Sequence, residues 1–138
     1  MGIFLGIDGG GTKTTCVVGD EKNLLGTGTS GGSNVVRLGE AQARGSLEAA
    51  ILKACQAAKV EPSRVERTCI GVAGASVPEV REAIRRFIAE IVPGEVIVVG
   101  DNEVALEAAF GGASGVIVAS GTGSIAYGRN EQGKTARA

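Results

Sequence analysis

The chain has 138 residues, of which 43% are hydrophobic and 21% are charged. This length and composition predict one globular domain, or one domain with a piece of another, and exclude a long disordered tail. The net charge is −1 and the Lys and Arg residues are scattered, so the charge pattern predicts no nucleic-acid partner and no anionic membrane partner. No apolar run approaches the ~20 residues that span a membrane.

Three cysteines, Cys16, Cys55 and Cys69, lie in apolar runs and lack the paired spacing of metal sites. We therefore expect them to be small buried hydrophobic residues. Because their number is odd and no signal peptide is recognisable, the sequence predicts a cytoplasmic protein.

Three strands are expected first along the chain. Residues 3–8 form an apolar run that ends in the carboxylate of Asp8, and three glycines follow. Residues 14–18 are rich in β-branched side chains, and residues 24–29 come after a polar turn. This pattern predicts a strand, a tight loop and two further strands that form an antiparallel meander.

Helices and strands alternate in the rest of the chain. Apolar residues recur at helical spacing over residues 38–59, which predicts the longest helix. A strand is expected at residues 68–72. The helix after it should begin with Ser76 as N-cap, with Pro78 in the first turn and Glu79 completing a capping box. The remaining predicted elements are a buried strand at 96–99, a short helix at 104–110, a hairpin of strands 116–119 and 125–128, and a polar turn at 129–138.

This order of elements predicts an α/β fold with a mixed sheet of ribonuclease-H-like topology. An antiparallel meander is continued by parallel strands, and helices lie on both faces. The closing hairpin repeats the opening one, since each has an apolar strand, a loop of Gly and Thr, and a second strand. We interpret it as the start of a second, similar domain. The expected division is a first domain at residues 1–112 and the first hairpin of a second domain at 113–138.

Two Gly-rich loops between strands are candidate anion-binding sites. Without Cβ atoms the backbone can form a concave nest of N–H groups, although a plain tight turn is the alternative for a lone Gly triplet. Asp8 ends a buried strand, where a Mg²⁺ ion with its waters would offset the cost of the charge. The candidate residues are Asp8, Gly9, Gly10, Gly11 and Thr12 in the first loop and Gly121, Thr122 and Gly123 in the second.

The residues around both loops resemble a known family. The segment 6–14, GIDGGGTKT, is similar to the first phosphate motif of the actin, hexokinase and Hsp70 superfamily. The segment 120–124, SGTGS, is similar to the second phosphate motif of its N-acetylglucosamine and glucosamine kinases, in the BadF/BadG/BcrA/BcrD ATPase branch. The resemblance implies ATP and Mg²⁺ as cofactors and ATP-dependent phosphorylation of an amino sugar. A Walker loop or a Rossmann site is disfavoured, because a strand and not a helix follows the first loop.

The resemblance also implies which residues act on the acceptor. Asp101, after the strand at 96–99, matches the family's catalytic base, and a carboxylate at a strand end beside a helix N-terminus suits that role. Its alternative role is an N-cap of the helix at 104–110. The implied sugar-binding residues are Ser33, Asn34, Gly74, Ala75, Asp101 and Asn102. For the loops at 31–34 and 73–75, a plain turn or a helix cap is the alternative.

In the family the chain continues through a second domain that supplies the adenine pocket and further sugar contacts. The isolated chain is therefore expected to be inactive, and its closing hairpin, with apolar strands, to form a homo-oligomer or to exchange with another copy. Two other functions are alternatives. An ATPase activator of 2-hydroxyacyl-CoA dehydratases or benzoyl-CoA reductases needs a cysteine near the second loop, whereas the last cysteine is Cys69. The second alternative function is a non-catalytic sugar-binding module.

Overall fold

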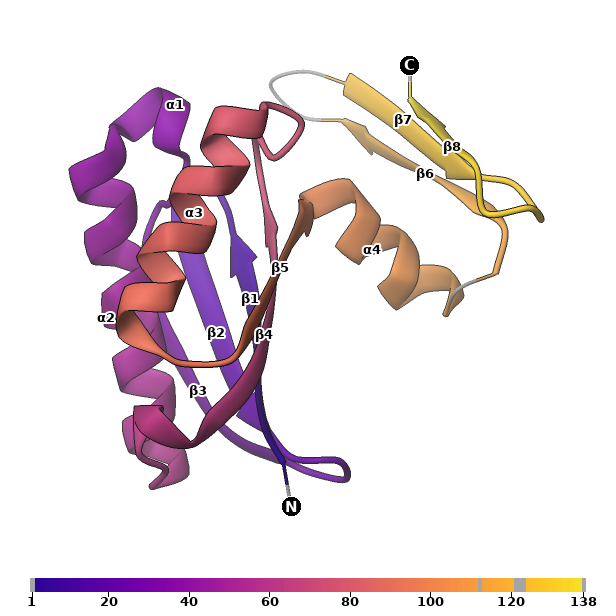
Figure 1. The fold of residues 1–138 in the computed structure, drawn as a ribbon. Coiled ribbons are helices and arrows are strands. Elements are labelled where there is room, and N and C mark those ends of the chain that lie inside the picture. Colours follow the sequence, from indigo (N-terminus) through magenta and orange to yellow (C-terminus); the bar gives the residue numbers. More distant parts are fainter. Residues whose placement is uncertain (1, 112, 121–123, 138) are drawn as a thin grey trace. The chain divides into compact units, whose positions relative to one another are not determined.

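A computed structural model describes residues 2–111, 113–120 and 124–137 of the chain (Figure 1). The chain divides into two compact units, Met1–Asp101 and Asn102–Ala138. The domain limit predicted between residues 112 and 113 falls inside the second unit, and it stays a prediction about the complete protein. Among the described residues, no helix is both long enough and apolar enough to cross a membrane.

The first unit contains a five-stranded sheet with the order β3-β2-β1-β4-β5. Its strands are β1 (Ile3–Gly9), β2 (Lys13–Gly19), β3 (Leu24–Gly31), β4 (Val65–Val72) and β5 (Glu95–Gly100). The pairs β1–β2 and β2–β3 are antiparallel, whereas β1–β4 and β4–β5 are parallel. The predicted meander and its parallel continuation are therefore confirmed.

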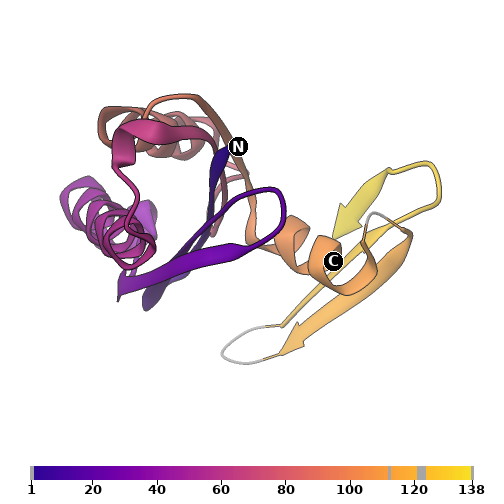
Figure 2. The same ribbon diagram turned by 90° about the horizontal axis from the view of Figure 1, so that it is seen from below.

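Two long helices cover one face of this sheet, as the view in Figure 2 shows most clearly. They are α2 (Glu40–Ala58) and α3 (Pro78–Ile91). A short 3₁₀ helix, η1 (Pro62–Arg64), leads from α2 into β4. The placement of a helix on the opposite face stays a prediction, because the next helix along the chain belongs largely to the second unit.

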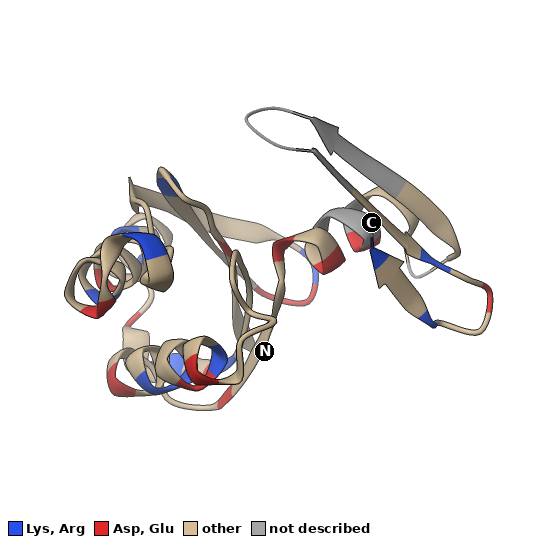
Figure 3. Ribbon diagram, turned by 90° about the horizontal axis from the view of Figure 1, so that it is seen from above, with Lys and Arg blue, Asp and Glu red and all other residues tan. Residues whose placement is uncertain are grey.

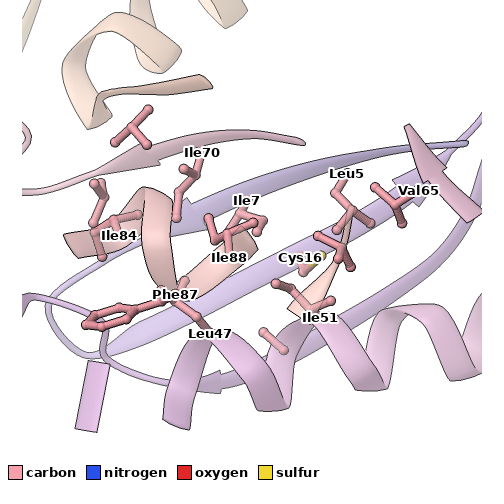
Figure 4. Close-up of a cluster of buried hydrophobic side chains, with 14 of the residues drawn as sticks. Leu5, Ile7, Cys16, Leu47, Ile51, Val65, Ile70, Ile84, Phe87 and Ile88 are labelled. Carbon is pink, nitrogen blue, oxygen red and sulfur yellow. The ribbon is translucent and has the colours of Figure 1, made fainter. Parts of the chain in front are cut away.

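The core lies between these helices and the sheet (Figure 4). Its members recur at helical spacing on α2 and α3 and at every second position on the strands, so one apolar stripe meets one apolar face. Burying each large aliphatic side chain contributes about 1.5–3 kcal/mol. Fully buried members include Leu47, Ile51, Ile70, Ile84 and Ile88.

The helix predicted at 38–59 is interrupted at its start. The chain forms a single helical turn, α1 (Val35–Leu38), and then breaks at Gly39, whose φ of 86° is outside the helical region, before α2 begins. At its other end, α2 stops at Lys59, which has the left-handed φ of 57°. The break separates α1 from the long helix and leaves α1 beside the loop that follows β3.

The capping box predicted for α3 is wrong. Val77 is the N-cap residue, and no side chain caps the helix. The reason is a tight turn before the helix, in which the Val77 N–H donates to the Gly74 carbonyl at 3.0 Å. Ser76 is part of this turn, so α3 starts one residue later than predicted. Glu79 therefore no longer stands at the N3 position.

Two of the three cysteines are buried as expected, but Cys69 is exposed. Side chains alternate along a strand, and its neighbours Thr68 and Ile70 are fully buried, so Cys69 points to the face that α2 and α3 do not cover. Burial raises the pKa of the Cys16 thiol to about 12. Cys16 is therefore protonated at neutral pH and acts as a packing residue.

Charged residues on the helices of the first unit are mixed in sign, as Figure 3 shows. Arg44 pairs with Glu90, and Arg85 pairs with Glu82 at 2.9 Å. Arg86 lies 4.0 Å from Glu40 and also over the ring of Phe87. These pairs are exposed, and each contributes about 0–1 kcal/mol.

The second unit contains most of α4 (Asp101–Phe110) and a three-stranded antiparallel sheet with the order β6-β7-β8. Its strands are β6 (Gly115–Ser120), β7 (Ser124–Arg129) and β8 (Thr135–Arg137). The predicted hairpin is confirmed, but the predicted polar turn contains the short strand β8. Sequence pattern could not reveal it, because all three of its residues are exposed and it has no apolar alternation.

Candidate functional site

The parallel strands bring three candidate segments to one edge of the five-stranded sheet. Gly9, Val72 and Gly100 are aligned in register across β1, β4 and β5. The carboxyl ends of parallel strands meet at the same edge, and ligands of open α/β sheets bind there. The first Gly-rich loop starts at Gly9 itself. The loop at 73–76 directly follows Val72, and Asp101 directly follows Gly100.

The first Gly-rich loop is a tight connection between β1 and β2. The Gly10 N–H donates to the Lys13 carbonyl at 2.9 Å and closes the turn. A Cβ atom on Gly9 would lie 2.6 Å from Oγ of Ser33, so a side chain at this position would displace the neighbouring loop. Asp8 and Thr12, on either side of the glycines, are both exposed. The loop therefore presents polar side chains and glycine backbone together.

The loop after β3 packs directly against this turn. The Ser33 N–H donates to the Gly10 carbonyl at 3.0 Å. Gly32 lies so close to Gly11 that an added Cβ would overlap its carbonyl group, whose carbon would be only 2.7 Å away. The predicted phosphate loop and the predicted sugar loop are thus one packed unit, a contact that their separation in sequence did not reveal.

Ser33 and Asn34 occupy different environments in the loop after β3. Ser33 is fully buried, and its hydroxyl accepts a hydrogen bond of 2.8 Å from the Thr14 hydroxyl. A contact between Ser33 and sugar stays a prediction, and the contact present in the structure fastens the loop to β2. Asn34 is half-buried and caps α1, its Oδ1 accepting from the Arg37 N–H at 3.1 Å. The NH₂ group of the same side-chain amide is a hydrogen-bond donor, so Asn34 offers both an acceptor and a donor.

The loop at 73–76 is fixed from two sides. The Ala73 N–H donates to the Gly9 carbonyl at 3.3 Å, which ties this loop to the first one. The guanidinium of Arg81 donates two hydrogen bonds, of 3.0 and 2.8 Å, to the Ala75 carbonyl. Gly74, with φ of 86°, is exposed, whereas Ala75 is buried. Sequence reasoning missed Arg81, because its role depends on a backbone carbonyl that no motif records.

Asp101 stands at the end of β5 and is exposed. Helix α4 begins at Asp101 itself, three residues before the predicted start, so this carboxylate lies in the first helical turn and not before it. A negative charge in this position is favoured by the helix dipole. Asn102, the next residue, is half-buried.

The second Gly-rich loop was predicted to supply Gly121, Thr122 and Gly123, and these three residues lie outside the described part of the chain. The strands on either side are described, with Ser120 paired to Ser124. The hairpin geometry around the loop is therefore the one expected from the sequence.

Known proteins resemble this chain over nearly its whole length. The chain is 36% identical to the N-acetylmuramic acid/N-acetylglucosamine kinase of Clostridium acetobutylicum, with 99% of this chain and 45% of that protein covered. It is 31% identical to the N-acetyl-D-glucosamine kinase of Dictyostelium discoideum, with 98% and 46% covered. A solved structure from Chromobacterium violaceum, described as a candidate N-acetylglucosamine kinase, matches with a TM-score of 0.79 and 25% identity, covering 100% of this chain and 48% of the other.

The chain thus spans about half the length of the relatives that it matches. A family model matches residues 5–138, which include both Gly-rich loops and the strand that ends at Gly100. The chain therefore belongs to the BadF/BadG/BcrA/BcrD ATPase family.

Proposed function

We propose that this chain is the N-terminal part of an ATP-dependent kinase that phosphorylates an amino sugar, N-acetylglucosamine or glucosamine. The observation that carries the proposal is the packing of the loop at 31–34 onto the first Gly-rich loop through the Ser33–Gly10 hydrogen bond. A phosphate site and an acceptor site must be adjacent for direct transfer. The names of the relatives support the substrate class.

In this proposal each segment has a distinct task. The backbone N–H groups of the first Gly-rich loop bind phosphate of ATP, and the same task is proposed separately for Gly121, Thr122 and Gly123 of the second loop. Asn34 orients the sugar through its amide group. Asp101 accepts the proton of the acceptor hydroxyl as the phosphoryl group arrives in line. Thr14 and Arg81 act indirectly, since they fasten the loops at 31–34 and 73–76.

The chain also fits a role for Mg²⁺. Asp8 is exposed beside the first Gly-rich loop, and no group of three or more acidic, Cys or His side chains within the described ranges could form a complete protein cage. Mg²⁺ is commonly bound by one or two carboxylates together with substrate phosphates and water. When bound with the nucleotide, it would neutralise charge on the phosphates, and Asp8 would hold it through water.

The activator of acyl-CoA enzymes is a weaker candidate. That function needs a cysteine ligand near the second Gly-rich loop, whereas Cys69 lies within β4 of the first unit. The non-catalytic sugar-binding alternative makes a different prediction, namely sugar binding without turnover. Both alternatives can be separated from the kinase by one assay.

The full-length protein is expected to consume ATP in the presence of N-acetylglucosamine or glucosamine, and to do so faster than with glucose or a polyol. A coupled assay that follows ADP release across this panel of acceptors measures the preference. Faster turnover with an unrelated polyol would exclude the amino-sugar assignment. Sugar binding by calorimetry without any turnover would support the non-catalytic module instead.

We expect the isolated 138-residue chain to be inactive and to self-associate through its closing hairpin. Val116 on β6 has 62% of its surface exposed, although it belongs to an apolar strand. Such a surface favours pairing with a second copy. Sedimentation across a concentration range should show association for the chain and a monomer for a version that ends at Gly112. Monomers in both cases would contradict the expectation.

A further inference from the structure

Arg37 places a guanidinium group beside the first Gly-rich loop. A methyl group added at Gly11 would lie 3.7 Å from Nη1 of Arg37, although the two residues are 26 positions apart in the chain. Arg37 lies in the single turn of α1, and its backbone N–H donates to the side chain of Asn34. Asn34, which is proposed to orient the sugar, thus also fixes the backbone of Arg37.

This arginine is not neutralised by a neighbour in the described ranges 2–111, 113–120 and 124–137. Arg44, Arg85 and Arg86, in contrast, each have a glutamate within 4.0 Å. The side chain of Arg37 is exposed and carries no ion pair among those residues. An exposed guanidinium beside glycine backbone is a suitable donor to a planar or tetrahedral anion, because it offers two parallel N–H groups.

Its contacts indicate which anion it meets. The guanidinium lies beside Gly11 of the proposed phosphate loop, and the backbone N–H of Arg37 donates to Asn34 of the proposed sugar loop. The group that passes from one loop to the other during the proposed reaction is the phosphoryl group. We propose that Arg37 donates hydrogen bonds to the phosphoryl group that is transferred, an inference that rests on the proposed kinase function.

In that reaction the bond between the γ-phosphorus and the bridging oxygen of ATP breaks, and the electron pair leaves with ADP. The acceptor hydroxyl oxygen bonds to phosphorus, and its proton passes to Asp101. Negative charge is spread over the three other phosphoryl oxygens during transfer, so a guanidinium at this place stabilises the transition state. Arg37 is then a further catalytic residue, beyond the loop glycines and Asp101.

The test compares Arg37→Gln with Arg37→Lys in the full-length enzyme. Arg64→Gln is the matched control, because Arg64 is also exposed on a single helical turn but precedes β4 at the opposite edge of the sheet. Calorimetry gives the Kd of ATP and of ADP without sugar. Steady-state kinetics gives kcat and KM with N-acetylglucosamine and with N-acetylmuramic acid, which carries an additional lactyl ether group with a carboxylate.

For Arg37→Gln we expect kcat to fall by about 10- to 100-fold with both sugars, the loss typical of a charge-assisted hydrogen bond to a reacting phosphate. The affinity for ATP should fall at least ~5-fold and that for ADP should not change, because ADP lacks the transferred group. Arg37→Lys should recover part of the loss, and Arg64→Gln should behave as wild type.

Two results would overturn the inference. One is an unchanged kcat together with an unchanged ratio of ATP to ADP affinity. The other is a loss confined to KM for N-acetylmuramic acid, which would assign Arg37 to the carboxylate of the acceptor. If the wild-type enzyme phosphorylates no amino sugar, the proposed function fails, but the ratio of ATP to ADP affinity in Arg37→Gln still decides whether Arg37 contacts the terminal phosphate.

Discussion

Asp101→Asn in the full-length enzyme is expected to lower kcat by at least ~10², with little change in KM for ATP. The substitution keeps the size of the side chain and an oxygen acceptor, but an amide cannot take the proton of the acceptor hydroxyl. Asp101 follows β5 directly, at the strand edge where the other candidate loops meet. Steady-state kinetics at saturating amino sugar, with ATP varied, measures both constants.

Glu103→Gln is the matched control for Asp101→Asn. Glu103 is an exposed carboxylate in the same first turn of α4, so the helix dipole acts on it as on Asp101. Unlike Asp101, it does not directly follow β5. It should retain wild-type kcat. Equal activity of Asp101→Asn and wild type would return Asp101 to a purely helical role, and similar losses in both variants would indicate damage to α4.

Gly32→Ala is expected to reduce kcat/KM by at least ~10² and to destabilise the protein by about 1–3 kcal/mol. An added Cβ would overlap the carbonyl group of Gly11, and backbone cannot move aside as a flexible side chain can. The loop at 31–34 would therefore separate from the first Gly-rich loop, and the Ser33–Gly10 hydrogen bond would be strained or lost. Urea denaturation and steady-state kinetics measure the two effects.

Gly45→Ala makes the same chemical change where the structure has room for it. Gly45 lies in α2, is exposed, and an added Cβ would meet nothing within 4 Å. Because Ala favours a helix interior more than Gly, this variant should gain about 0.5–1 kcal/mol and keep full activity. A Gly32→Ala variant as stable and active as Gly45→Ala would show that the two loops need not touch.

Local pattern in the sequence was sufficient to predict most of the elements and their order. Apolar runs of strand length, helical spacing and Gly-rich punctuation placed the five strands, the two long helices and the closing hairpin within a few residues of their observed bounds. The ends of β1 and β5 were placed closely enough to locate Asp8 and Asp101 at strand ends. These features depend on residues close to one another in the chain, which is why one sequence could reveal them.

Contacts between distant segments were decided only by the tertiary structure. The sequence predicted that Ser33 and Asn34 both bind the sugar. In the folded chain, however, the Ser33 side chain is buried against Thr14, whereas Asn34 caps the start of α1. Likewise, nothing in the local sequence around Arg37 or Arg81 records the loop that each approaches. Such roles arise because the sheet aligns strands from different parts of the chain, and a side chain's partner then depends on register and packing, which local periodicity does not encode.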